Sequence, residues 1–123
     1  MTTSGTPFSP DARTGDIVLL PYPFTDHAGA KKRPVLVVAQ ADGQGDFVAV
    51  PVTSSPGHLN AISLQQPDMA AGALPKPSWI KAEQPYTLHV SLIVKRFGSV
   101  KPTVLSSVRT ALGVRLGFVG DAP

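Results

Sequence analysis

Apolar residues occur in short runs that glycine and proline separate along most of the chain. From Asp16 to Leu20 the residues read DIVLL, and Pro21 and Pro23 follow this run closely. An aliphatic run of this length that ends at proline predicts a strand. The run from Val35 to Ala39 is apolar at every position. A continuous run of this kind predicts a second strand with both faces buried.

The segment from Asp46 to Thr53 alternates along its length and predicts a third strand. Before it, Asp42, Gly43 and Gly45 predict a hairpin turn. Because Pro51 has no N–H to donate to a ladder, we expect it at an edge or a bulge. The two faces of this strand carry, respectively, Val48, Val50 and Val52, and Phe47, Ala49, Pro51 and Thr53.

Shorter strands are predicted at Ala61 to Leu64, Ser78 to Gln84 and Val94 to Phe97. The stretch from Gln65 to Pro77, which contains further glycine and proline, predicts a long loop. The last segment has the pattern of an amphipathic helix. Its apolar residues recur at spacings of one, three and four: Val104, Leu105, Val108, Leu112 and Leu116.

Composition supports short strands over long helices. Thirteen prolines and eleven glycines among 123 residues interrupt the chain too often for long helices almost everywhere. Pro102 suits the first turn of the terminal helix, and Gly117 can end it. The pattern therefore predicts a mainly β protein with a barrel core, in one domain over residues 14–118. We expect flexible tails at residues 1–13 and 119–123.

Charge and cysteine content narrow the class of protein. The chain has 11 basic and 8 acidic residues, a net charge of +3 that permits a polyanionic partner without requiring one. It has no cysteine, which excludes disulfides and thiolate zinc sites. No apolar run reaches the length of a membrane helix, and the N-terminal residues lack the pattern of a secretory signal. We therefore expect a cytoplasmic protein without a membrane partner.

The KKRP block, Lys31 to Pro34, concentrates positive charge just before a buried strand. Pro34 restricts Arg33 to an extended conformation, and a guanidinium held in this way can bind phosphate through two parallel hydrogen bonds. The alternative is a solvated turn whose lysines keep a sheet edge soluble.

Other side chains could also carry chemistry. Thr53 and Ser54 could donate hydrogen bonds to a phosphate or satisfy backbone groups in a turn. The period of a strand places Trp79, Lys81 and Glu83 on one face. Glu83 could act as a base beside the Lys81 cation, or the two could be a surface pair.

An aromatic ring can stack on a nucleic-acid base or close the rim of a barrel, and Trp79 fits either role. His27 lies in the first loop, where an imidazole could transfer protons. The three histidines show no spacing that suggests a metal site.

The order of these segments resembles the PemK/MazF family of toxins from bacterial toxin–antitoxin pairs. The resemblance runs from about Gly15 to Gly117 and rests on GDIVLLPYPFTD, KKRPVLVV, PVTS, PSWIKAEQPYTL and FGSV. It implies an SH3-like barrel with a C-terminal helix, assembled as a homodimer. It also implies a metal-independent endoribonuclease that cleaves single-stranded RNA at preferred sequences and so arrests translation. The implied partner is a cognate antitoxin with a disordered acidic and apolar tail.

The resemblance also implies roles for individual residues. Arg33 matches the family's catalytic arginine, which would stabilise charge on the phosphorus and could also donate a proton to the leaving oxygen. Thr53, with Ser54, would orient the phosphate, while Lys31, Lys32, His27 and Trp79 would bind RNA. The products would be a 2′,3′-cyclic phosphate and a 5′-hydroxyl, formed when the 2′-hydroxyl attacks.

One segment departs from the family pattern. In one branch of the family, the block that KAEQPYT resembles reads R-x-D-Q-P-R-T, and its first arginine and its aspartate are the acid and base. Lys81 and Glu83 would take these roles here, whereas Tyr86 replaces the second arginine. The lost arginine leaves open a catalytically inactive nucleic-acid-binding homologue. A second alternative is a toxin that poisons DNA gyrase, because a structurally related toxin group shares the implied barrel.

Overall fold

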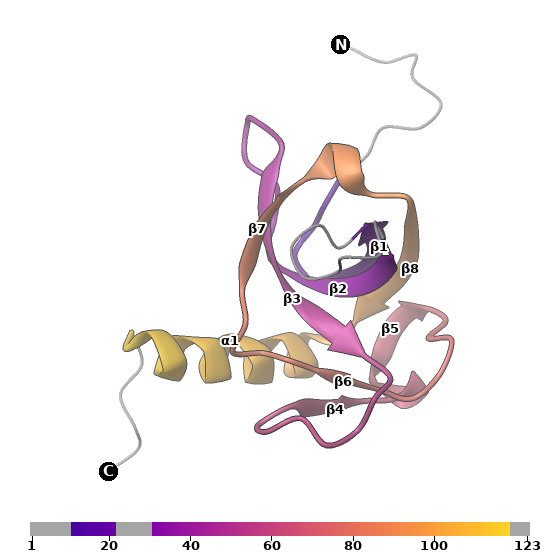
Figure 1. The fold of residues 1–123 in the computed structure, drawn as a ribbon, viewed down its shortest axis with the longest axis vertical. Coiled ribbons are helices and arrows are strands. Elements are labelled where there is room, and N and C mark those ends of the chain that lie inside the picture. Colours follow the sequence, from indigo (N-terminus) through magenta and orange to yellow (C-terminus); the bar gives the residue numbers. More distant parts are fainter. Residues whose placement is uncertain (1–10, 22–30, 119–123) are drawn as a thin grey trace.

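The computed structural model describes residues 11–21 and 31–118. The described chain forms eight antiparallel strands and one α-helix (Figure 1). The strands are β1 (Asp16–Pro21), β2 (Lys32–Ala39), β3 (Asp46–Thr53), β4 (Ile62–Leu64), β5 (Met69–Gly72), β6 (Ser78–Ile80), β7 (Tyr86–His89) and β8 (Lys95–Val100). The helix is α1 (Pro102–Leu116), and short 3-10 turns occur at η1 (Gln66–Asp68) and η2 (Val90–Leu92).

The sheet curls on itself into a half-barrel. Its strand order is β4-β6-β3-β2-β1-β8-β5, and β7 pairs with β3 outside this path. Figure 1 shows β1, β2 and β8 bending around a common axis, while the long β3 crosses from the barrel to the lower strands. The prediction of a mainly β barrel followed by a C-terminal helix is confirmed.

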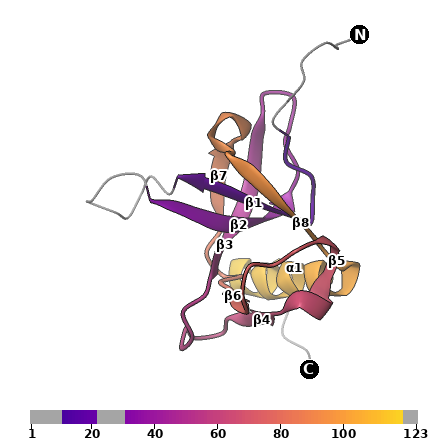
Figure 2. The ribbon, with the colours of Figure 1, turned by 90° about the vertical axis from the view of Figure 1, so that its right-hand side faces the viewer.

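The central strands are buried on both faces. Leu36 and Val38 of β2 pack into one apolar cluster, which α1 covers. Val35 and Val37 pack into a second cluster on the opposite face. Figure 2 shows α1 lying along one side of the curled sheet, next to β4, β5 and β6. The apolar run of β2 was therefore correctly predicted to have two buried faces.

The predicted faces of β3 are confirmed by the same clusters. Val48, Val50 and Val52 belong to the cluster beneath the helix, whereas Phe47 and Ala49 belong to the opposite one. Ala12, which we expected in the N-terminal tail, is buried in this second cluster, and its carbonyl accepts a hydrogen bond from the Ala41 N–H at 2.9 Å.

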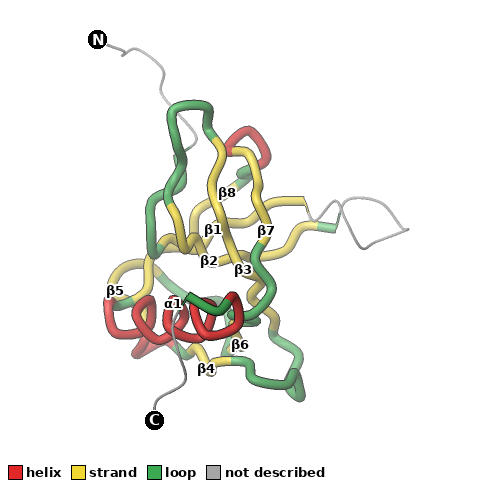
Figure 3. The backbone as a smooth tube through the Cα atoms, turned by 90° about the vertical axis from the view of Figure 1, so that its left-hand side faces the viewer, coloured by secondary structure: helices red, strands yellow, loops and turns green. Residues whose placement is uncertain are grey.

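The helix begins and ends where the sequence predicts. Pro102 is its first residue, and Gly117 caps its end with φ +83°, in the left-handed region that favours glycine. Arg109 ties the helix to β2, because its Nε and Nη2 donate to the Val38 carbonyl at 3.1 and 2.8 Å. Figure 3 shows the helix lying across the lower end of the barrel. Leu116, the last residue of the predicted apolar stripe, is 52% exposed.

Among the described residues, no helix is long and apolar enough to cross a membrane.

Several predicted elements differ from the structure. The stretch from Gln65 to Pro77 is not all loop, because η1 and β5 lie within it. β5 has the sequence MAAG, whose small residues carry little strand signal, and its pairing with β8 forms it. β7 was not predicted, and β8 runs beyond Phe97 and Gly98 to Val100.

The prediction that a strand continues to Gln84 is wrong. β6 ends at Ile80. The Lys81 N–H then donates to the Pro51 carbonyl at 2.9 Å, and the Gln84 N–H donates to the Lys81 carbonyl at 3.2 Å. The first bond extends the pairing of β6 with β3 by one residue, and the second closes a turn, so Glu83 does not continue the strand face of Trp79.

Pro51 occupies neither an edge nor a bulge. It is buried within β3 and pairs with Val35 of β2. On its other side, β3 pairs with β7 as far as Ala49 and with β6 from Val52 onward. The Pro51 carbonyl points away from β2 and accepts the Lys81 N–H at the end of β6. The N–H and C=O of one strand residue point to the same side, so the missing N–H of Pro51 removes no bond from the β2–β3 ladder.

The predicted hairpin turn between β2 and β3 is confirmed. The Asp42 carboxylate accepts the N–H groups of Asp46 at 3.0 Å and Gln44 at 2.8 Å. These backbone bonds lower the pKa of Asp42, and the bond from Asp46 has the largest effect. Gly45 has φ +86°, which a residue with a side chain rarely adopts.

Substitution of Gly72 by Ala should destabilise the fold. Gly72 has φ +79°, and a Cβ there would overlap the Phe97 carbonyl oxygen of the neighbouring strand. We expect Gly72→Ala to lower the free energy of unfolding by about 2 kcal/mol or more, measured by urea titration. Gly43→Ala is the control, because a Cβ at this turn position meets nothing within 4 Å. Equal stability of the two variants would contradict the close packing of β5 on β8.

Candidate functional site

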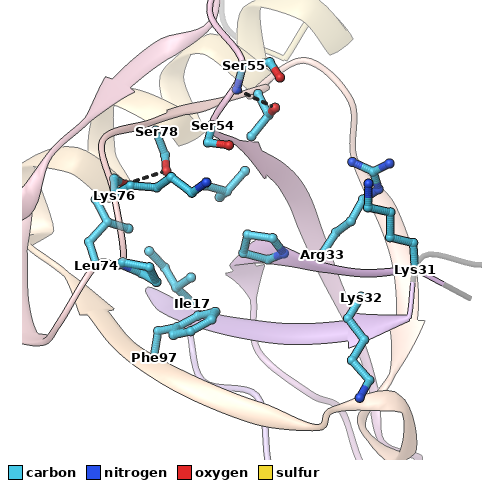
Figure 4. Close-up of a pocket in the computed structure, with 14 residues that line it drawn as sticks. Ile17, Lys31, Lys32, Arg33, Ser54, Ser55, Leu74, Lys76, Ser78 and Phe97 are labelled. Atoms are coloured by element: carbon cyan, nitrogen blue, oxygen red, sulfur yellow. Dashed lines mark hydrogen bonds between the residues drawn. The ribbon is translucent and has the colours of Figure 1, made fainter.

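A cavity of about 440 Å³ opens where β2 begins and β3 ends (Figure 4). Its apolar lining comes from the cluster beneath the helix and its neighbours, and its polar lining from loops and strand ends. The lining residues are Ile17, Lys31, Lys32, Arg33, Pro34, Val52, Thr53, Ser54, Ser55, Leu74, Pro75, Lys76, Ser78 and Phe97. The cavity is therefore lined by β1, β8, the start of β2, the end of β3 and the connection from β5 to β6.

The register of the β2–β3 hairpin brings Arg33 and Thr53 together. The last registered pair of the two strands is Val35 with Pro51. Two residues farther along each antiparallel strand, Arg33 and Thr53 stand opposite each other, and opposite residues carry their side chains on the same face. Arg33 is also held by pairing with Leu20 of β1. The expected convergence of Arg33 and Thr53 in one cavity is confirmed.

The hydroxyl groups of the cavity are positioned by local hydrogen bonds. The Thr53 Oγ1 accepts the Ser55 N–H at 3.1 Å, in a turn at the end of β3. Since this bond uses a lone pair of the oxygen, the Thr53 hydroxyl hydrogen remains available to a ligand. Ser54 follows directly and is exposed to solvent. Ser78 begins β6, the strand that pairs with the end of β3, and donates its Oγ–H to the Lys76 carbonyl at 2.9 Å.

The described lining carries positive charge only. Its ionisable members are Lys31, Lys32, Arg33 and Lys76, and no carboxylate or imidazole is among the described residues that line it. Arg33 and Lys31 lie on one side of the cavity, and Leu74 and Lys76 lie on the other (Figure 4). A hollow with cations on both sides and hydroxyl donors between them suits an anionic ligand.

Five of the predicted site residues line the cavity: Lys31, Lys32, Arg33, Thr53 and Ser54. Trp79 does not, although it pairs directly with Thr53 across β3 and β6. Lys81 and Glu83 line a separate hollow of about 130 Å³ together with His58, Leu59 and Gln84. His27 lies outside the described residues.

Sequence reasoning missed the contribution of the β5–β6 connection. Leu74, Pro75, Lys76 and Ser78 all line the cavity, as does Phe97 of β8. Within the sequence, the only local signal was a lysine between two prolines, Pro75 and Pro77, in a segment predicted to be a loop. Across residues 11–21 and 31–118, no group of three or more His, Asp or Glu side chains could hold a metal ion.

Comparison with known proteins gives a consistent result. The profile of a family described as "PemK-like, MazF-like toxin of type II toxin-antitoxin system" matches residues 13–116. A search of curated proteins gives no significant match.

Solved structures share the fold over nearly their whole length. A chain of the MazE-MazF crystal structure (Form-III) from Deinococcus radiodurans has 27% identity and a TM-score of 0.65, covering 91% of this chain and 100% of that one. MazF (Form-I) from the same organism has 26% identity and a TM-score of 0.67, covering 89% and 98%. A structure described as "Endoribonuclease in complex with its cognate antitoxin from Mycobacterial species" has 20% identity and a TM-score of 0.68, covering 87% and 96%.

Proposed function

Because the chain belongs to the family of PemK-like, MazF-like toxins of type II toxin–antitoxin systems, we propose that it is an endoribonuclease that cleaves single-stranded RNA in the cavity of Arg33 and Thr53. The observation that carries the proposal is the meeting of Arg33, Thr53 and the lysines in one cavity. The description of a mycobacterial structure of this fold as an endoribonuclease supports it.

The proposed reaction uses a nucleophile that RNA itself supplies. The 2′-hydroxyl attacks the adjacent phosphorus, the bond to the 5′-oxygen breaks, and a 2′,3′-cyclic phosphate and a 5′-hydroxyl result. Negative charge gathers on the nonbridging phosphate oxygens in the transition state, so fixed cations and N–H or O–H donors lower the barrier. Such a reaction requires neither a metal nor a covalent intermediate with the protein.

Arg33 is the proposed electrostatic catalyst. Its guanidinium offers several N–H donors in a planar fork that matches two phosphate oxygens, and it does not act as a base at neutral pH. The hydroxyls of Thr53 and Ser54 would hold the same phosphate in register with the arginine. Lys31 and Lys32 are exposed at the mouth of the cavity and would neutralise flanking phosphates.

Lys81 and Glu83 receive no step in this proposal. They line a different hollow from Arg33 and Thr53, and the replacement of arginine by Lys81 loses the bidentate contact. Two-fold homodimerisation and neutralisation by a cognate antitoxin complete the proposal. The presence of cognate antitoxins or MazE in the structures of similar fold supports the latter.

Replacement of Arg33 by Ala should abolish most of the cleavage. The purified protein is incubated with a long single-stranded RNA in the presence of EDTA, and new ends are mapped. We expect discrete 5′-hydroxyl ends with the unmodified protein. With Arg33→Ala we expect a rate lower by about 10²–10³-fold, because one transition-state contact is lost.

Arg115→Ala is the matched control, because this exposed arginine lies in the last turn of α1. Intact RNA together with trapped gyrase–DNA complexes would instead identify a gyrase poison. RNA binding without cleavage would identify an inactive homologue. Either result contradicts the proposed function.

Thr53 provides a second test, since its hydroxyl can be removed with little change in shape. Thr53→Val should lower kcat about 10²-fold because it loses a donor to the phosphate, while Thr53→Ser should keep most of the activity. Single-turnover kinetics at saturating protein measures the difference. If the valine variant were as active as the serine variant, the hydroxyl would have no part in catalysis.

A further inference from the structure

One cation of the cavity has no part in the roles described so far. The side chain of Lys76 extends from the wall opposite Arg33 towards the middle of the cavity (Figure 4). We propose that Lys76 is a further catalytic residue, the acid that donates a proton to the departing 5′-oxygen of RNA. This inference rests on the proposed ribonuclease function.

The backbone on both sides of Lys76 is restricted. Lys76 stands between Pro75 and Pro77, and a residue that precedes proline is confined to extended conformations. The Ser78 Oγ donates to the Lys76 carbonyl at 2.9 Å, and Ser78 itself is only 6% exposed. The backbone that carries Lys76 is therefore held in place, which lowers the backbone part of the entropy cost of placing its ammonium in the cavity.

The start of the same segment is held by Gln66. Its amide Nε2 donates to the Gly72 carbonyl at 3.2 Å, and its Oε1 accepts the Leu74 N–H at 2.8 Å. Leu74 packs against the apolar cluster beneath the helix. The connection from β5 to β6 is thus fixed at both ends, and Lys76 lies two residues before β6.

The position of Lys76 suits a proton donor. In a displacement at phosphorus the attacking and leaving oxygens lie roughly in line, on opposite sides of the phosphorus. In the proposed arrangement Arg33 and Thr53 hold the nonbridging oxygens, and the leaving oxygen needs a donor of its own. Lys76 approaches from the opposite wall, whereas Lys81, the acid that the family resemblance implies, lines another hollow.

The proposed step balances without a further reactant except water. The 2′-oxygen forms a bond to phosphorus and its proton passes to solvent water, while the bond between phosphorus and the 5′-oxygen breaks. The Lys76 ammonium transfers one proton to that oxygen, giving the 5′-hydroxyl, and the resulting amine regains a proton from solvent. The reaction as a whole releases and consumes no protons.

A substrate whose leaving group needs no proton tests this role. In an RNA with a bridging sulfur at the cleaved 5′ position, the thiolate departs unprotonated. We expect Lys76→Ala to cleave ordinary RNA at least about 10²-fold more slowly than the unmodified protein, and to cleave the sulfur substrate at nearly the unmodified rate. Arg33→Ala should be slow on both substrates.

Two further variants separate proton transfer from charge. Lys76→Arg keeps the positive charge but cannot readily release a proton, so we expect it to be slow on ordinary RNA and restored on the sulfur substrate. Lys101→Ala is the control, because this exposed lysine lies outside the cavity. It should match the unmodified protein on both substrates.

The inference is overturned if Lys76→Ala cleaves ordinary RNA normally, or if it is equally slow on both substrates. It is also overturned if Lys81→Ala, rather than Lys76→Ala, is slow on ordinary RNA and regains the unmodified rate on the sulfur substrate. In each of these outcomes the unmodified protein still cuts RNA, so only the role of Lys76 fails. If the unmodified protein cuts neither substrate, the proposed function itself fails.

Discussion

The antiparallel register between β2 and β3 is the constraint on which the site depends. Each of these strands buries alternate residues in two different apolar clusters. A slip of one residue would move every buried side chain to the wrong cluster, so burial on both faces fixes the register strongly. The same register sets Arg33 opposite Thr53 at the open end of the hairpin. Core packing and the candidate site are thus determined by one pairing.

This dependence explains how much of the site could be predicted from the sequence. The turn at Asp42 to Gly45 and the two apolar strands are local signals, and together they imply an antiparallel hairpin. Its register shifts between Val37 and Ala39, so the pairs near its open end could not be counted from the turn. Arg33 and Thr53 were assigned to one site by the resemblance to the PemK/MazF family. The apolar stripe of α1 and its glycine cap are also local signals, and the predicted start and end of the helix agree with the structure.

The rest of the site could not be predicted because it depends on distant pairing. β5 is formed by its contacts with β8, about thirty residues later, and its own alanines and glycine give no strand signal. The placement of Lys76 depends on that strand and on the hydrogen bonds that the Gln66 side chain makes to the backbone of Gly72 and Leu74. Conversely, alternation suggested a shared face for Trp79, Lys81 and Glu83, but the Gln84 N–H donates to the Lys81 carbonyl and turns the chain before Glu83 can continue the strand. Family resemblance did not correct this error, because it compares residue types and not the place where a strand ends.

Pro51 has a consequence for the mechanics of the cavity. Since β3 leaves β7 and joins β6 at this residue, the end of β3 that carries Thr53 is attached to the small β4–β6 sheet. Arg33 is attached to the large sheet through β1. The two side chains therefore lie on strands that pair with each other but have different outer neighbours, β6 beside Thr53 and β1 beside Arg33. A substrate seated between them would contact both parts of the curled sheet.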